Sequence, residues 1–314
     1  MLEKTLLWVT LGMSLLVVGC APRSAPPIAP PVIYSAVQHR VMPPFTRIKV
    51  DGPISVALHT GDARPQVILH GDPRDLAAVT TMVVNSMLQI NIGKGYPKFG
   101  GIHAEIRGKY LNAFIYHGVG TITGNNLRSS LLDLSIANEG KTTLQGQMVL
   151  RSLEVSGNGY TQISTISSPG LRVRLIGAPR VKLAGVVNLT SLDMDSGWLS
   201  MYWVKSKLLT IRGKGAALIQ LAGVVDKLDV ELCDKARFNG RYLRSNITFV
   251  KTFDQSLAEI TTIDKQHTLA SGNSDIHFYK IPKMKTDFMA FNGAVLDMRD
   301  LRSPFVQEYN RYNK

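Results

Sequence analysis

The sequence is poor in the residues that cross-link small exported domains or bind metals. Of its 314 residues only two are cysteines, Cys20 and Cys233, so no disulfide framework can hold the fold together. No C-x-x-C pair is present, and the seven histidines include neither an H-x-H nor an H-E-x-x-H pair. The G-x-S-x-G sequence of serine hydrolases is also missing. We therefore expect no metal, no cofactor and no catalytic residues.

Charged residues are also few, and basic residues outnumber acidic ones. Only 19% of the residues are charged, too few for a coiled coil or a long solvated helix, whereas 45% are hydrophobic, enough to fill a core. Lys and Arg number 36 against 23 Asp and Glu, which gives a net charge of +13. This surplus indicates an anionic partner: nucleic acid, an anionic membrane surface or an acidic polysaccharide.

Residues 1–19 have the pattern of a secretory signal peptide. Lys4 precedes an apolar run from Leu6 to Val18 that is too short to span a bilayer. The run leads into Val-Val-Gly-Cys20, which resembles the lipobox of bacterial lipoproteins, and this resemblance implies that Cys20 is acylated and begins the mature chain. Ala21, where an Asp would signal inner-membrane retention, implies outer-membrane sorting and leaves the periplasmic or outer side open. Export argues against nucleic acid as the partner.

The rest of the chain divides by composition into a tether, a body and a tail. Residues 20–44 contain seven prolines, so we expect an extended tether behind the lipid anchor. Residues 45–297 form the predicted body. Residues 298–314 are polar with interspersed aromatics, and they either cap the last turn of the body or contact a partner.

The body combines strand-like alternation with a short repeat. Residues 45–50, 54–58, 66–69 and 88–92 alternate apolar with polar side chains, and residues 73–80 favour one short helix. From about residue 110 a unit of two short strands and a turn recurs every 17 to 21 residues. This step fits one coil of a stack in which each coil buries its apolar side against its neighbours. The predicted fold class is all-β, a single right-handed parallel β-helix (β-solenoid) with coils of about 19–21 residues.

The first strand of each predicted coil suggests a register. Its inward pairs are Leu132/Leu134, Leu153/Val155, Leu171/Val173, Leu192/Met194, Leu209/Ile211, Leu228/Val230 and Ile247/Phe249. The outward positions between them mix both signs of charge, and Arg174 is expected beside Glu154 and Asp195 of the neighbouring coils. We therefore expect this face to neutralise much of its own charge through ion pairs between coils.

Several segments of the body resemble a known bacterial family. They are residues 45–56 (FTRIKVDGPISV), Val67 to Gly71, Leu88 to Ile92, and the Ser-Gly-Asn turns at Ser156 to Gly159 and Ser271 to Asn273. Together they look like the "putative auto-transporter adhesin, head GIN domain" family over about Phe45 to Asp297. The resemblance implies an exported or lipid-anchored β-solenoid without established catalysis, and the family name implies adhesion. It supplies no active-site motif, and other coils carry different turns.

The second strand of each predicted coil carries a basic and aromatic outward surface without matching carboxylates. Its candidate ligand-binding residues are Arg180, Lys182, Tyr202, Arg237, His277 and Tyr279. Cationic hydrogen bonds and ring faces suit an anionic or neutral glycan, lipopolysaccharide or another envelope protein. Trp198, Met201 and Trp203 also crowd one coil, but we expect them to pack as core and rim rather than to form a ligand platform.

These observations favour a non-catalytic, adhesin-like binding module, anchored to the outer membrane through Cys20 and directed at envelope or surface ligands. One alternative is a structural component of an envelope assembly such as a secretion apparatus. Another is a polysaccharide lyase or hydrolase, with Asp193, Asp195, Arg172 and Arg174 as the candidate cluster. Pairing between opposite charges explains that cluster more simply.

Overall fold

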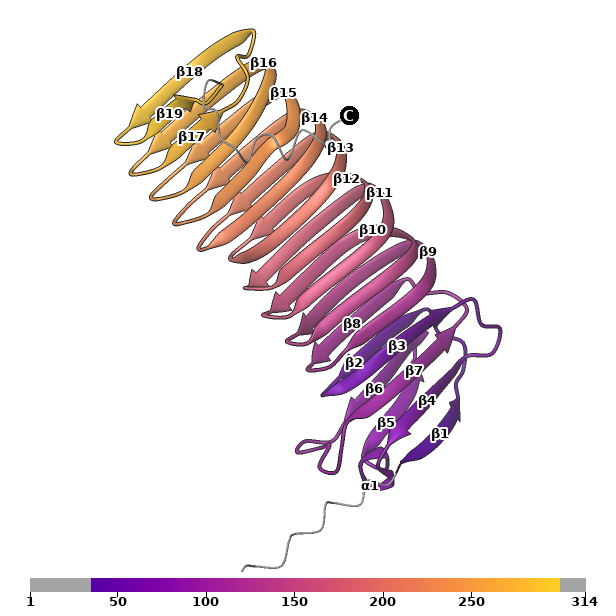
Figure 1. Ribbon diagram of the computed structural model, residues 1–314. Coiled ribbons are helices and arrows are strands. Elements are labelled where there is room, and N and C mark those ends of the chain that lie inside the picture. Colours follow the sequence, from indigo (N-terminus) through magenta and orange to yellow (C-terminus); the bar gives the residue numbers. More distant parts are fainter. Residues whose placement is uncertain (1–34, 300–314) are drawn as a thin grey trace, which may run out of the picture. The chain divides into compact units, whose positions relative to one another are not determined.

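The protein is described by a computed structural model that covers residues 35–299, of which 74% are in β-strands and almost none in helices. Its strands wind into coils that stack one on the next, from the indigo N-terminal strands to the yellow C-terminal ones (Figure 1). The predicted fold class, an all-β right-handed parallel β-solenoid, is confirmed. The short helix α1 (Pro73–Leu76) lies within the predicted range and begins at the N-cap Asp72.

Most coils consist of one long strand that bends at a corner. These strands are β9 (Ile122–Asn138), β10 (Lys141–Gly157), β11 (Tyr160–Gly177), β12 (Arg180–Met194), β13 (Gly197–Gly213), β14 (Ala217–Leu232), β15 (Arg237–Thr252) and β16 (Leu257–Ser271). Each pairs in parallel with the next along the chain. Positions 141, 160, 180, 198, 218, 237, 257 and 275 are successive partners, so one coil takes 18 to 20 residues. This range overlaps the predicted coil length of about 19–21 residues.

The inner face of the coils is a continuous apolar column. Both members of every predicted inward pair from Leu132/Leu134 to Leu228/Val230 are buried. Stacking one coil on the next removes these side chains from water, and each burial contributes about 1.5–3 kcal/mol. The prediction for Ile247/Phe249 is wrong, because both are only half-buried and Thr248 and Val250 point inward instead.

The interior near β15 is lined partly by hydroxyl groups. A shift of one residue exchanges the two faces of a strand, and here it places Thr248 inside. Thr262 Oγ1 donates to Thr248 Oγ1 at 2.8 Å, and Ser274 Oγ donates to Thr252 Oγ1 at 2.9 Å. Because these hydroxyls bond to one another across coils, small polar side chains are tolerated inside.

The outer face carries one column of alternating charge. Its members, successive register partners from β10 to β15 and all exposed, are Glu154, Arg174, Asp193, Arg212, Glu231 and Lys251. Arg174 lies beside Glu154 as predicted, but its partner in β12 is Asp193 rather than Asp195. Within residues 35–299 no direct ion pair joins members of this column. The predicted ion-pair ladder is therefore not formed by this column, whose opposite charges stand on adjacent strands about 4.8 Å apart.

Shorter strands build the N-terminal end. They are β1 (Ala36–Val41), β2 (Arg47–Asp51), β3 (Ile54–Thr60), β4 (Gln66–Gly71), β5 (Val79–Val84), β6 (Met87–Ile92), β7 (Ile102–Gly108) and β8 (Ala113–Gly118). The coil of β2 and β3 lies between β6/β7 on one side and β8/β9 on the other. Beyond it β4 and β5 pair antiparallel with β7 and β6, and β1 pairs with β4.

Strand β1 corrects the predicted tether. It lies within residues 20–44, so the ordered body begins before Phe45. The guanidinium of Arg40 in β1 donates to the Val79 carbonyl at 2.7 Å and to Thr81 Oγ1 at 3.2 Å, both in β5. These two edge strands are thereby tied together, which closes the N-terminal end of the stack.

The C-terminal end is built differently. It consists of β17 (Asp275–Phe278), β18 (Met284–Phe291) and β19 (Ala294–Asp297). Large apolar side chains are exposed on β18 and β19, among them Met284, Met289, Phe291 and Leu296. The predicted signal peptide, Cys20 and residues 300–314 lie outside the described residues.

Candidate ligand-binding surface

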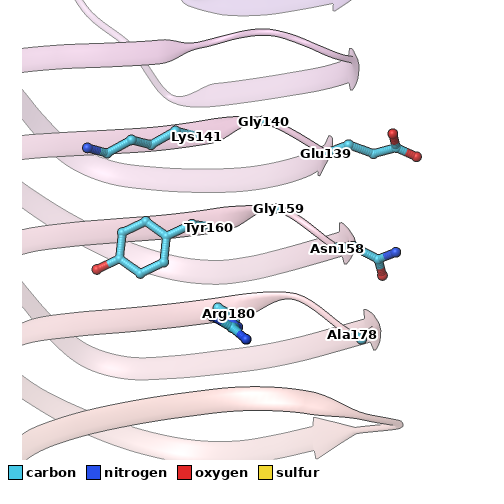
Figure 2. Close-up of a pocket in the computed structure, with 8 residues that line it drawn as sticks. All are labelled: Glu139, Gly140, Lys141, Asn158, Gly159, Tyr160, Ala178 and Arg180. Atoms are coloured by element: carbon cyan, nitrogen blue, oxygen red, sulfur yellow. The ribbon is translucent and has the colours of Figure 1, made fainter.

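A shallow hollow lies at the turns that precede β10, β11 and β12. It has a volume of about 740 Å³ and opens to solvent along one side of the coils. Its lining residues are Glu139, Gly140, Lys141, Asn158, Gly159, Tyr160, Ala178 and Arg180 (Figure 2). Three successive turns therefore contribute equivalent positions to one surface.

Close backbone packing fixes these turns. A Cβ atom on Gly140 would lie 2.2 Å from the Gly120 carbonyl oxygen, so only glycine fits there. The buried amide of Asn138 accepts from the Gly140 N–H at 2.9 Å and donates to the Gly120 carbonyl at 2.9 Å. One side chain thus holds two successive turns together, and the strand that follows each turn starts at an equivalent height.

The first residues of these strands form a line. Lys141, Tyr160 and Arg180 are successive register partners, about 4.8 Å apart from rung to rung. Figure 2 shows the Lys141 and Tyr160 side chains on the same side of the turns, with Glu139 and Asn158 pointing the other way. Lys182 follows Arg180 by two residues and therefore faces the same side of its strand. We call Lys141, Tyr160, Arg180 and Lys182 the basic-aromatic ladder.

The cations of the ladder have no anionic partner in the part of the chain that the structure describes. Lys141, Arg180 and Lys182 are exposed, and none of them forms an ion pair there. The Tyr160 ring is half-buried, and its hydroxyl donates to Gln162 Oε1 at 3.1 Å. Three free cations around one ring suit a ligand that carries repeated anionic groups.

The structure separates the six ligand-binding residues that the sequence predicts. Only Arg180 and Lys182 lie together, in the ladder. Arg237 occupies the same column as Arg180, but Trp198 and Leu218 lie between them, a separation of about 14 Å for three rungs. Tyr202 lies at the corner of β13, whereas His277 and Tyr279 lie near the C-terminal end.

Tyr279 belongs to a cluster of groups that satisfy one another. Its hydroxyl donates to Glu259 Oε1 at 2.9 Å, and the same oxygen accepts from Nε of Arg241 at 2.9 Å. The Arg241 guanidinium also lies 4.4 Å from the Tyr279 ring centroid. Burial, together with the charge of Glu259, raises the pKa of Tyr279 well above its usual range. These contacts favour a role in joining coils.

Two residues of the ladder, Lys141 and Tyr160, are missing from the sequence prediction. A signal for them exists, because each directly follows the glycine of a turn: Gly140-Lys141 and Gly159-Tyr160. Aligning Gly140 with Gly159, and Gly157 with Gly177, places both in one column with Arg180. The apolar residues of the other strand give a different alignment, because bulges between the two strands shift the register.

Other chemistry finds little support in the described residues. Residues 35–299 contain no group of three His, Cys, Asp or Glu side chains placed to hold a metal ion. Asp193 and Arg174, proposed for a polysaccharide-cleaving cluster, are register partners in the column of alternating charge. Burial raises the pKa of the Cys233 thiol, which keeps it protonated and a poor nucleophile. Among the described helices, none is long and apolar enough to cross a membrane.

The fold and the ladder define a parallel β-solenoid with an exposed cationic strip. Residues 44–188 match the family "Putative auto-transporter adhesin, head GIN domain". The predicted resemblance is confirmed, although the match ends within β12 rather than near Asp297. It includes the whole basic-aromatic ladder.

Several solved structures are similar to the chain. A putative adhesin from Parabacteroides merdae has a TM-score of 0.45 and 14% identity, over 84% of this chain and 95% of that one. A putative adhesin from Parabacteroides distasonis has a TM-score of 0.45 and 14% identity, over 85% and 98%. A putative lipid binding protein from the same species has a TM-score of 0.40 and 12% identity, over 84% and 96%. A search of curated proteins finds no match.

Proposed function

We propose that the protein is an adhesin-like, non-catalytic binding module of the bacterial envelope whose basic-aromatic ladder binds an anionic glycan. The observation that carries this proposal is the register of Lys141, Tyr160 and Arg180, which aligns free cations and a ring on successive coils. A polymer with a carboxylate, sulfate or phosphate on each repeating unit meets several of these groups at once. The family name, which refers to an adhesin, agrees with this role.

The test compares two triple variants with equal loss of charge. Lys141→Ser, Arg180→Ser and Lys182→Ser remove the cations of the ladder, and the control removes the exposed Lys207, Lys214 and Lys235 in the same way. Binding is measured to immobilised lipopolysaccharide and polygalacturonate, with neutral dextran as a blank. We expect the ladder variant to bind at least tenfold more weakly, because three charge-assisted contacts are lost. Equal loss in both variants would show that only net charge matters.

The proposal includes attachment to the outer membrane through Cys20. The supporting pattern is the lipobox-like end of the apolar run at residues 6–18. Palmitate labelling of growing cells should mark the wild-type protein and leave Cys20→Ser unlabelled and released from the membrane fraction. Protease treatment of intact cells then reports whether the body faces outward or into the periplasm.

One observation favours a second role, as a component of an envelope assembly. The last coil exposes Met284, Met289, Phe291 and Leu296 beside strands with open edges, and such patches mark interaction surfaces. A photo-crosslinking amino acid placed at Phe291 should then give a discrete adduct in intact cells. The same group at Tyr110, exposed near the other end of the body, is the matched control.

A further inference from the structure

Trp203 stands out from the rest of the solenoid by its exposure and its backbone. Its side chain is 69% exposed at the corner of β13, whereas Met201 of the same coil is fully buried. The expectation that Trp198, Met201 and Trp203 all pack as core and rim is therefore wrong for Trp203. Its backbone has a φ of 69°, in the left-handed region that a bulky residue rarely adopts.

The corners of alternate coils show that this conformation belongs to the fold. Asn126, Thr165 and Trp203 occupy equivalent corners of β9, β11 and β13, with φ of 57°, 61° and 69°. The residue after each of them pairs with a glycine of the next coil: Gly146, Gly185 and Gly223. A Cβ on Gly223 would lie 2.0 Å from the Val204 carbonyl oxygen, so this packing is strict. The corner thus requires a left-handed residue, for which asparagine is well suited and tryptophan is not.

A strained and exposed tryptophan gains nothing from burial, so its presence points to a function outside the fold. Trp203 lies within a register shift on both sides. The residues that these shifts leave opposite it are Gly185 and Val186 of β12 and Ala222 of β14. The 69% exposure of Trp203 leaves most of this residue open to solvent. Val186, Val224 and the Tyr202 ring are exposed beside it, at 61%, 51% and 38%.

The size of this apolar patch restricts what it can bind. It covers three coils, about 10–15 Å across, whereas a stable protein interface takes about 800 Å² from each partner. An exposed indole within an apolar patch of this size matches the apolar C–H face of one or two pyranose rings. Lys205 is exposed two residues further along β13, and with the Tyr202 hydroxyl it can bond to sugar hydroxyls. We propose that Trp203 is the platform of a second glycan subsite, on which a pyranose ring stacks.

This inference rests on the proposed function as a glycan-binding adhesin, but it uses other residues. The ladder lies at the turns before the strands, and Trp203 lies at the corner in the middle of β13. The ladder selects for negative charge, whereas the Trp203 subsite selects for the shape of a neutral ring face. The two sites can therefore be removed independently.

The experiment uses Trp203→Asn, because asparagine suits the corner conformation and occupies it in β9. The wild-type protein is screened on a glycan array of hexose, N-acetylhexosamine and uronate oligomers, and the strongest binder is then titrated. We expect Trp203→Asn to bind that oligosaccharide at least tenfold more weakly. Its melting temperature should be unchanged or higher by about 1–3 °C, because strain is relieved. The exposed Tyr110→Asn is the matched control and should bind like the wild type.

Each outcome separates this subsite from the ladder. Loss of binding in Trp203→Asn with full binding in the ladder variant supports a subsite that works without the ladder. The reverse result overturns the subsite and leaves the proposed function standing. Absence of any array binder, equal affinity of wild type and Trp203→Asn, or Trp203-dependent binding to anionic phospholipid vesicles in place of glycans would also overturn it.

Discussion

Phe249 of β15 and His267 of β16 lie ring on ring, with centroids 4.5 Å apart and planes 8° from parallel. Lys227 of β14 places its Nζ 5.1 Å from the Phe249 ring centroid. On the other side Asp287 of β18 lies 3.0 Å from Nδ1 of His267. One line of contacts on the outer face therefore joins four strands, in the order cation, ring, ring and carboxylate.

Replacing Phe249 with Ala should loosen the C-terminal coils. The change removes a half-buried ring, its stack on His267 and its contact with the Lys227 ammonium, at a cost of about 1–2 kcal/mol. Contacts in a solenoid join only neighbouring coils, so the loss should appear as faster hydrogen exchange in β16 and β18, with β10 to β12 unchanged. Phe249→Tyr keeps the ring and serves as the control. Unchanged exchange in β16 would refute the structural role of the stack.

The same phenylalanine shows where hydrophobic patterning fails. In Ile247-Thr248-Phe249-Val250 the more apolar pair is Ile247 and Phe249, so alternation places that pair inside. The structure reverses it, because Thr248 bonds to Thr262 of the next coil and Phe249 stacks on the outer face. Both reasons depend on a neighbouring coil, and neither is visible within one stretch of sequence.

The candidate ligand-binding surface could be predicted only in part, for a related reason. The coil length and the outward face of Arg180 and Lys182 follow from the repeat itself. Their alignment with Lys141 and Tyr160 depends on turn geometry, which Asn138 and the close packing of Gly140 fix. The exposure of Trp203 depends on the corner of β13, whereas hydrophobicity alone predicts that this tryptophan is buried.

The column of alternating charge can be tested by reversing one member. Asp193→Lys places a cation between Arg174 and Arg212, its register partners on either side. Like charges on adjacent rungs should lower stability by about 0.5–1 kcal/mol at low salt, because all these groups are exposed. Melting curves at 50 and 500 mM NaCl should show the loss shrinking as salt screens the repulsion. Asp195→Lys, outside the column, is the matched control and should show a smaller salt effect.

The N-terminal strands should lose stability in weak acid because of His103. Burial lowers the pKa of His103, and the charge of His70 lowers it further, since the two ring centroids lie 6.0 Å apart. His59 also lowers this pKa, whereas Glu105 raises it. The unfolded chain therefore binds this proton more readily, and stability present above about pH 6.5 is lost as the pH falls toward the lowered pKa of the folded state.

We expect hydrogen exchange in β4 and β7 to quicken, after correction for the intrinsic rate, between pH 7.5 and pH 5.5. His103→Gln should remove most of this dependence, whereas His39→Gln, an exposed position on β1, should keep it. A His103→Gln variant with the full wild-type dependence would assign the effect to other groups.

The closure of the N-terminal end depends on Arg40. Its guanidinium also donates to the Leu76 carbonyl at 3.3 Å, so one side chain supplies donors to α1 and to β5. Arg40→Ala should cost about 1–3 kcal/mol, because partly buried carbonyl groups lose charged donors. Proteolysis should then cut first near β1 and β5, with the coils from β10 onward intact. Arg47→Ala removes a single exposed bond to the Asn85 carbonyl and is the control. If both variants resist protease equally, Arg40 does not hold this end closed.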